Sequence, residues 1–219
     1  ILRVLKKNMG FGMTWGRAMH EFVEQLAKDE RLRSLSFQNV KVVPFLGTPG
    51  AIQSDSWNTT TYSNTLATKV GNLLHCASYN LSAPMYVEGT KEKELIESID
   101  EIAKVLHMAE TADIALIGIG SMQDDSSIIK AEIRTKEEYK ELVRKGAVGE
   151  IVGRIYDKNG QTVDEDLKRK MVGISLDKIA KIPVRVGMSY GKDKIEAIKG
   201  AIAGGLVNVL VTDVPTAEL

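Results

Sequence analysis

The sequence of 219 residues has a single cysteine, Cys76, so no internal disulfide can form and a reducing cytoplasm is the expected compartment. Its 29 basic residues are balanced by 29 acidic ones, and a net charge of zero gives this segment no basic face for nucleic acid. No apolar run reaches the length of a membrane span, and the sequence shows no signal-peptide pattern. These absences argue against a disulfide scaffold, a membrane anchor and direct DNA binding.

Hydrophobic residues make up 43% of the chain, which is enough for a substantial core. Apolar runs alternate with amphipathic stretches almost from end to end. We expect strands at residues 9–13, 40–45, 83–87, 113–119, 151–156, 184–187 and 206–212. Helices are expected after Thr14 and over residues 65–77, 91–110, 136–144 and 192–203. This rhythm predicts one α/β domain over residues 1–219, with a mainly parallel sheet covered on both faces.

Two strand-to-helix junctions have the composition of phosphate sites. The first reads TWGR at residues 14–17, and the second reads GKDK at residues 191–194. Free backbone N–H groups and the positive end of the helix dipole meet at such junctions, so anions bind there. Thr14 is also a helix N-cap candidate, which is compatible with an anion site. Lys194 is more informative, because a cation at a helix start is disfavoured unless an anion is bound.

Five glycine-rich or polar turns are expected at one edge of the sheet, where ligands bind in open parallel sheets. They cover residues 14–17, 47–50, 118–121, 146–150 and 191–194. Each turn taken alone is explained by the backbone freedom of glycine. Together they predict a pocket for a small phosphorylated ligand.

Several reactive side chains have a plainer explanation. His20, His75 and His107 lie far apart in helical stretches and match neither a zinc site nor a catalytic triad. Cys76 is interpreted as a core thiol, and the Asp124-Asp125 pair as solvated loop carboxylates. We therefore predict no catalytic residue, no metal and no cofactor.

Seven blocks in a fixed order carry a family resemblance: TWGR, VVPFLGTPG, LSAPMY, TADIALIGIGS, KGAVGEIVGRIYDKNG, the IPVRVGMSYGKDKIEAIKGAIAGG segment and VNVLVTD. They resemble the C-terminal effector-binding domain of the SorC family of bacterial transcription regulators. The resemblance implies a three-layer Rossmann-like fold, similar to that of glucosamine-6-phosphate deaminases, ribose-5-phosphate isomerases and CoA transferases. It also implies a phosphorylated sugar effector, a homodimer or tetramer, and operator DNA bound only through an N-terminal helix-turn-helix. Since the sequence begins at Ile1, we expect that domain to lie upstream of it.

The same resemblance assigns ligand-binding roles by motif position. Glu150 is expected to accept hydrogen bonds from sugar hydroxyls, and Gly191 with Lys194 to form a second phosphate turn. Tyr190 stands where the family usually has a first glycine. The loop after Phe45 has no arginine, which some relatives use for a second phosphate, so a monophosphate is expected rather than a bisphosphate. The expected ligand-binding set is Thr14, Trp15, Gly16, Arg17, Gly47, Thr48, Asn64, Gly118, Gly120, Ser121, Glu150, Gly191 and Lys194.

Two other functions stay open on the sequence. A phosphosugar isomerase or deaminase can share this architecture, and Glu150 would then be its base, although no second acid or base is evident. A protein-interaction module would use the glycine turns only as structure. A helix-turn-helix encoded upstream of Ile1 would favour the regulator, and the sequence does not identify the sugar.

Overall fold

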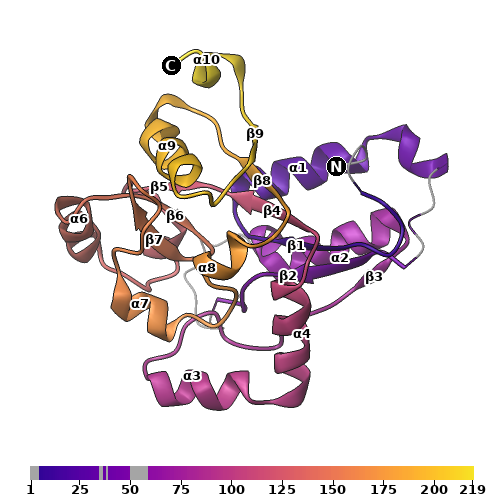
Figure 1. Ribbon diagram of the computed structural model, residues 1–219, viewed down its shortest axis with the longest axis horizontal. Helices are drawn as coiled ribbons and strands as arrows, with labels where there is room; N and C mark the ends of the chain where they lie inside the picture. Colours follow the sequence, from indigo (N-terminus) through magenta and orange to yellow (C-terminus); the bar gives the residue numbers. More distant parts are fainter. Residues whose placement is uncertain (1–4, 35–36, 38, 50–58) are drawn as a thin grey trace.

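The structure is a computed structural model that describes residues 5–34, 37, 39–49 and 59–219. Six parallel strands form its central sheet in the order β3-β2-β1-β4-β8-β9 (Figure 1). They are β1 Gly10–Met13, β2 Lys41–Pro44, β3 Ala77–Ser78, β4 Ile114–Gly118, β8 Val184–Met188 and β9 Val209–Val211. The order runs outward in both directions from the β1–β4 pair. Such a reversal creates a crevice at the carboxyl ends of the two strands, where ligands bind in this class of fold.

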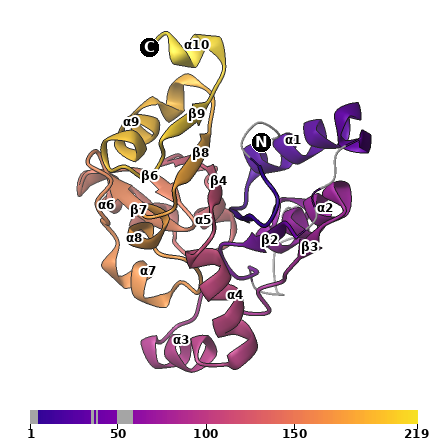
Figure 2. The same ribbon diagram turned by 45° about the vertical axis from the view of Figure 1, so that its right-hand side comes forward.

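The inner strands β1 and β4 are almost entirely buried and apolar, as strands covered on both faces must be. Ile114 and Leu116 pack into a cluster with α1 Arg17–Ala27 and α2 Ser63–Leu74. Ala115 and Ile117 point the other way, into a cluster shared with α4 Asp100–Glu110, α8 Leu176–Ile179 and α9 Ile195–Ala203. Figure 2 shows α1 and α2 on one side of the sheet and α9 on the other. The chain therefore forms the three-layer Rossmann-like α/β fold that its sequence predicts.

A second, antiparallel sheet has the order β5-β6-β7 and starts where β4 ends. Its strands are β5 Gly120–Ser121, β6 Ala147–Ile151 and β7 Arg154–Asp157. The remaining elements are α3 Thr90–Glu97, α5 Ser127–Lys130, α6 Lys136–Arg144, α7 Glu165–Lys170, α10 Val214–Ala217 and the short 3-10 turns η1 Glu30–Ser34, η2 Thr59–Thr61 and η3 Lys192–Lys194. This small sheet matters for function because it brings Glu150, on β6, beside the carboxyl end of β4.

Two expected strands are wrong. Residues 83–87 form only isolated bridges, Thr48 with Pro84 and Tyr86 with Met171. A proline lacks the N–H that a ladder needs, so an apolar run through Pro84 does not continue as a strand. The expected strand at 151–156 is divided by a turn at Val152 and Gly153, both of which have positive φ.

The expected helix at 91–110 is also wrong as one element. It breaks into α3 and α4 at Ser98 and Ile99, where the backbone of Ile99 is extended. The apolar residues of this run do not form one buried stripe, because Leu95 is 70% exposed and Ile99 is 49% exposed. Among the described residues, no helix is long and apolar enough to cross a membrane.

Candidate functional site

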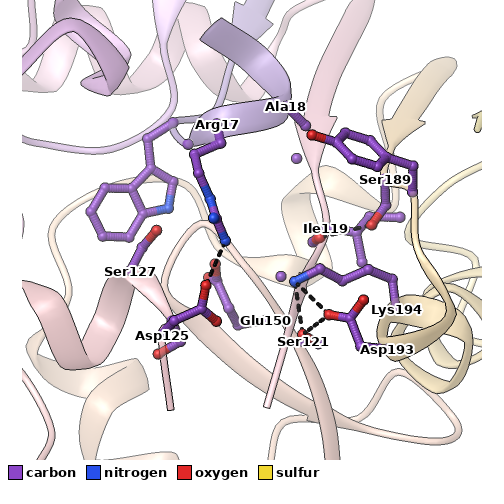
Figure 3. A pocket seen from close by; sticks show the side chains of 16 residues that line it. Arg17, Ala18, Ile119, Ser121, Asp125, Ser127, Glu150, Ser189, Asp193 and Lys194 are labelled. Atoms are coloured by element: carbon purple, nitrogen blue, oxygen red, sulfur yellow. Dashed lines mark hydrogen bonds and ion pairs between the residues drawn. The ribbon is translucent and has the colours of Figure 1, made fainter. Parts of the chain in front are cut away.

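A cavity of about 220 Å³ lies at the carboxyl ends of β1, β4 and β8, at the point where the strand order reverses. Five parts of the chain line it: the start of α1, the β4–β5 junction, the loop before α5, β6, and the segment after β8 (Figure 3). Its lining residues are Trp15, Gly16, Arg17, Ala18, Gly118, Ile119, Gly120, Ser121, Asp125, Ser126, Ser127, Glu150, Ser189, Tyr190, Asp193 and Lys194.

A hydrogen bond to β4 fixes the turn that follows β1. Thr14 is fully buried, and its hydroxyl oxygen accepts a 2.7 Å hydrogen bond from the backbone N–H of Gly118 on β4. Gly16 then takes φ 107°, a conformation that favours glycine, and α1 begins at Arg17 without a side-chain cap. The N-terminus of this 11-residue helix thus borders the cavity with its positive dipole end.

Lys194 enters the cavity from the opposite side. Its ammonium group donates a 2.7 Å hydrogen bond to the Ser121 hydroxyl and lies 3.5 Å from a carboxylate oxygen of Asp193. The Ser121 hydroxyl also lies 3.3 Å from the Asp193 carboxylate, so the three side chains form one cluster. This cluster fixes the lysine ammonium beside the end of β4.

Arg17 forms the second cationic contact at the cavity. Its guanidinium donates to the Asp125 carboxylate at 2.8 Å, and both side chains remain largely exposed. Partial burial raises the pKa of Asp125, but the contact with Arg17 outweighs it and leaves that pKa below its ordinary value. Figure 3 shows Arg17 and Lys194 reaching toward the centre of the cavity from different sides.

Glu150 is the buried carboxyl group of the site, with 6% of the residue exposed. It lies opposite Gly120 in the β5–β6 pair, and one of its oxygens accepts a 2.9 Å hydrogen bond from the N–H of Gly153. A Cβ on residue 120 would stand 2.6 Å from the other oxygen, so only glycine leaves room for this side chain. Burial raises the pKa of Glu150 to about 7, against the opposing effects of the Gly153 N–H and the Lys194 charge.

The structure brings eight of the expected site residues to one cavity. They are Trp15, Gly16, Arg17, Gly118, Gly120, Ser121, Glu150 and Lys194. Their roles in ligand binding stay predictions.

The other five expected residues do not line the cavity. Thr14 lies beneath it, and Gly191 starts the segment that carries Lys194, with φ 103°. Asn64 instead bonds the Thr48 hydroxyl at 2.8 Å and the backbone of Leu81, which ties the loop after β2 to a neighbouring segment. Gly47 belongs to that same loop, whereas Gly50, at the end of the expected turn, lies outside the described residues.

Sequence reasoning missed several lining residues and misplaced one turn. The interpretation of Asp125 as a solvated loop carboxylate is incomplete: its side chain is 53% exposed, but it also pairs with Arg17 at the cavity. Ser189 and Asp193 follow β8 directly, and their position after a strand was the available signal. The turn at 146–150 lies at the start of β6, so only Glu150 reaches the cavity from it.

The described residues hold no group of three or more His, Cys, Asp or Glu side chains that could bind a metal ion. What the cavity offers is two cationic side chains, a helix N-terminus, hydroxyl groups and a buried carboxyl group. This combination suits a small ligand with a compact anion at one end and hydroxyl groups at the other.

The whole chain, residues 1–219, matches a protein family described as "Putative sugar-binding domain". It is 35% identical over 154 residues to the transcriptional regulator LsrR of Escherichia coli O9:H4, covering 68% of this chain and 49% of LsrR. It is 29% identical over 219 residues to the sorbitol operon regulator of Klebsiella pneumoniae, covering 99% and 66% respectively. The chain thus spans about half to two thirds of the length of these relatives.

Solved structures show the same similarity. The full-length sorbitol operon regulator SorC from Klebsiella pneumoniae superposes with a TM-score of 0.86 at 28% identity, covering 99% of this chain and 67% of that one. A transcriptional regulator from Streptococcus pneumoniae TIGR4 also gives a TM-score of 0.86, at 26% identity, with 99% and 79% covered.

Proposed function

Because the chain belongs to the sugar-binding domain family of SorC-type regulators, we propose that its cavity binds a phosphorylated sugar that controls DNA binding by another domain of the same protein. The observation that carries the proposal is the meeting of Lys194, Arg17 and the α1 N-terminus around one cavity at the strand-order reversal. The relatives are named as transcriptional regulators, which supports this function over an isomerase or deaminase.

The phosphate would lie between the α1 N-terminus and Lys194. The uncapped N–H groups of the first helical turn and the lysine ammonium supply charge-assisted hydrogen bonds, which are the strong ones in proteins. Arg17 is exposed and already at the rim, so its guanidinium can turn from Asp125 to a bound phosphate. Two cations fit one phosphate group better than two, which favours a monophosphate.

The sugar itself would extend toward Glu150, Ser121 and Ser189. Ser121 and Ser189 are buried hydroxyl groups at the floor of the cavity, and Glu150 faces the same space from β6. The cavity volume of about 220 Å³ lies below the roughly 300 Å³ at which sites for drug-sized ligands begin. This size favours a single sugar unit.

Control of DNA binding would follow from differential affinity. The effector can shift the regulator between states only if it binds one state more tightly than the other. Because the relatives are longer than the chain, binding to an operator through another domain is part of this proposal. Assembly into dimers or tetramers is proposed together with it.

A thermal-shift screen tests the proposed function. A phosphorylated sugar should stabilise the folded chain, by about 2.7 kcal/mol at roughly 100 times its dissociation constant, whereas the matching free sugar should not. Fructose 6-phosphate, glucose 6-phosphate and ribose 5-phosphate, each beside its free sugar, form a suitable first panel. Equal stabilisation by the free sugars would refute the phosphate anchor.

A further inference from the structure

The charges around the cavity are not arranged as in a simple anion site. Arg17 and Lys194 are its two cations, whereas Asp125, Asp193 and Glu150 each contribute a carboxyl group. A phosphomonoester brings nearly two more negative charges above its second pKa, which is about 6. If every carboxyl group were ionised, the occupied site would hold about three negative charges in excess. This excess of negative charge favours protonation of one of the three carboxyl groups when the phosphate is bound.

The two aspartates lie at the exposed part of the cavity, each beside a cation. Asp125 is 53% exposed at its side chain and contacts Arg17 at 2.8 Å, and its pKa lies below the ordinary value despite partial burial. The Asp193 side chain is 51% exposed and lies 3.5 Å from the Lys194 ammonium. Water and a neighbouring cation therefore surround both of these side chains, unlike the buried carboxyl group of Glu150.

Glu150 lies in different surroundings. Among the described residues, the only hydrogen bond to its carboxyl group comes from the Gly153 N–H. The ionisable groups that face it are Lys194 across the cavity, Tyr139 on α6 and Tyr156 on β7. Burial raises the pKa of both phenols, and Glu150 raises it further, so both stay neutral. The charge of Lys194 alone among these groups favours the carboxylate form.

We infer that Glu150 binds the effector as a neutral carboxylic acid, and that effector binding takes up one proton at this residue. The inference rests on the proposed function, because it requires a phosphate beside Lys194. A phosphate there offsets the lysine charge that favours the ionised form, and it adds negative charge to the same cavity. Both changes favour the protonated acid.

The free protein needs only a small change to reach this state. Burial already brings the pKa of Glu150 to about 7, and removal of the Lys194 effect moves it higher. The proton also changes what the residue recognises. A carboxylate only accepts hydrogen bonds, whereas the neutral acid offers one O–H donor. Glu150 would thus select a ligand with an acceptor oxygen at that place, such as a carbonyl or ring oxygen.

Titration calorimetry tests the inference directly. The probe is the sugar phosphate of the three named above that stabilises the chain most, titrated in buffers of different ionisation enthalpy between about pH 7.5 and about pH 9. The phosphate group is already a dianion in this range. At pH values above the free-protein pKa of about 7 and below the pKa of Glu150 in the complex, wild type should take up most of one proton, and its Kd should approach a tenfold rise for each pH unit.

Glu150→Gln keeps the shape of the residue without the titration, so it should take up no proton and show a flat Kd. Asp125→Asn is the matched control: it removes a negative charge from the same cavity, keeps Glu150, and should retain the uptake. A second readout on wild type is the pH titration of the glutamate carboxyl carbons by NMR, where one resonance should stay protonated in the complex to above about pH 8.

The outcomes separate the two proposals. Binding with equal proton uptake in wild type and Glu150→Gln, or an ionised Glu150 resonance in the complex, would overturn the neutral-acid inference and leave the proposed function standing. If neither the sugar phosphates nor inorganic phosphate binds at any pH, the proposed function itself is refuted.

Discussion

Glu150→Gln should stabilise the free protein at alkaline pH, although it removes a charged residue from the candidate site. In the folded state the pKa of Glu150 is raised to about 7 by burial, from an ordinary value of 4.5. Between these two values the folded state binds more protons than the unfolded state, so stability falls as the pH rises through this window. Above about pH 7 the buried carboxylate lowers the free energy of unfolding by its full amount.

The magnitude follows from the two pKa values. Each pKa unit between the folded and unfolded states is worth about 1.36 kcal/mol. The difference between 4.5 and about 7 therefore lowers the free energy of unfolding by about 3 kcal/mol above pH 7, and by little near pH 4.5. Glutamine has nearly the same shape and can accept the Gly153 N–H with its amide oxygen. The variant should therefore match wild type near pH 4 and exceed it by about 2–3 kcal/mol near pH 8.5.

Urea denaturation of both proteins at a series of pH values measures this difference. Subtracting one curve from the other cancels every other titrating group, because the two chains differ at one position. A difference that is constant from about pH 5 to about pH 8.5 would refute the reasoning, since it would mean that Glu150 ionises in the folded chain as easily as in water.

Three further substitutions test the geometry of the site. Lys194→Ala should weaken sugar phosphate binding by about 1.5–3 kcal/mol in calorimetry with little change in apo stability, whereas Lys192→Ala, on the same turn but outside the cavity, should leave affinity unchanged. Gly120→Ala should destabilise the chain by about 1–3 kcal/mol in urea, because its Cβ would stand 2.6 Å from a Glu150 oxygen; an unchanged midpoint would contradict the close packing. Thr14→Val should lower the free energy of unfolding by about 0.5–1.5 kcal/mol, because the partly buried Gly118 N–H loses its acceptor, and Thr14→Ser should restore most of this stability.

Local signals in the sequence predicted elements well where the partners lie a few residues apart. The helix expected at 136–144 forms over those residues. A capping box explains the agreement: the Thr135 hydroxyl accepts from the Glu138 N–H, and the Glu138 carboxylate accepts from the Thr135 N–H. Both residues lie within one helical turn, so the boundary does not depend on the rest of the fold.

The break between α3 and α4 shows the limit of periodic patterns. Leu95 and Ile99 follow the helical spacing of Ile102, yet both are largely exposed, because the chain turns at Ser98 and carries α3 away from the sheet. A hydrophobic period indicates that a helix can form; which faces are covered depends on partners far along the chain. Asp125 is a second case, since its contact with Arg17 joins residues 108 positions apart.

Gly120 shows how a correct expectation can have an incomplete reason. The glycine at this position was expected as part of a glycine-rich ligand-binding turn, whereas in the structure it belongs to a strand and makes room for the Glu150 side chain. The sequence places glycines at the right edge of the sheet, but only the pairing of β5 with β6 shows what each one accommodates.

The same pairing explains how an architecture shared with enzymes can serve a regulator. A buried glutamate with a pKa near neutrality is what a general acid or base requires, and Glu150 has that property. Catalysis also needs a second group on the reacting atoms and contacts that strengthen only in the transition state. Here the other two acidic side chains lie against Arg17 and Lys194, and in the proposed complex these cations would face a phosphate that keeps its charge. Such contacts stabilise the bound ligand and its transition state alike, so they give affinity without turnover. A proton taken up by Glu150 on binding would then serve recognition, because the O–H that it creates is present for as long as the effector stays bound.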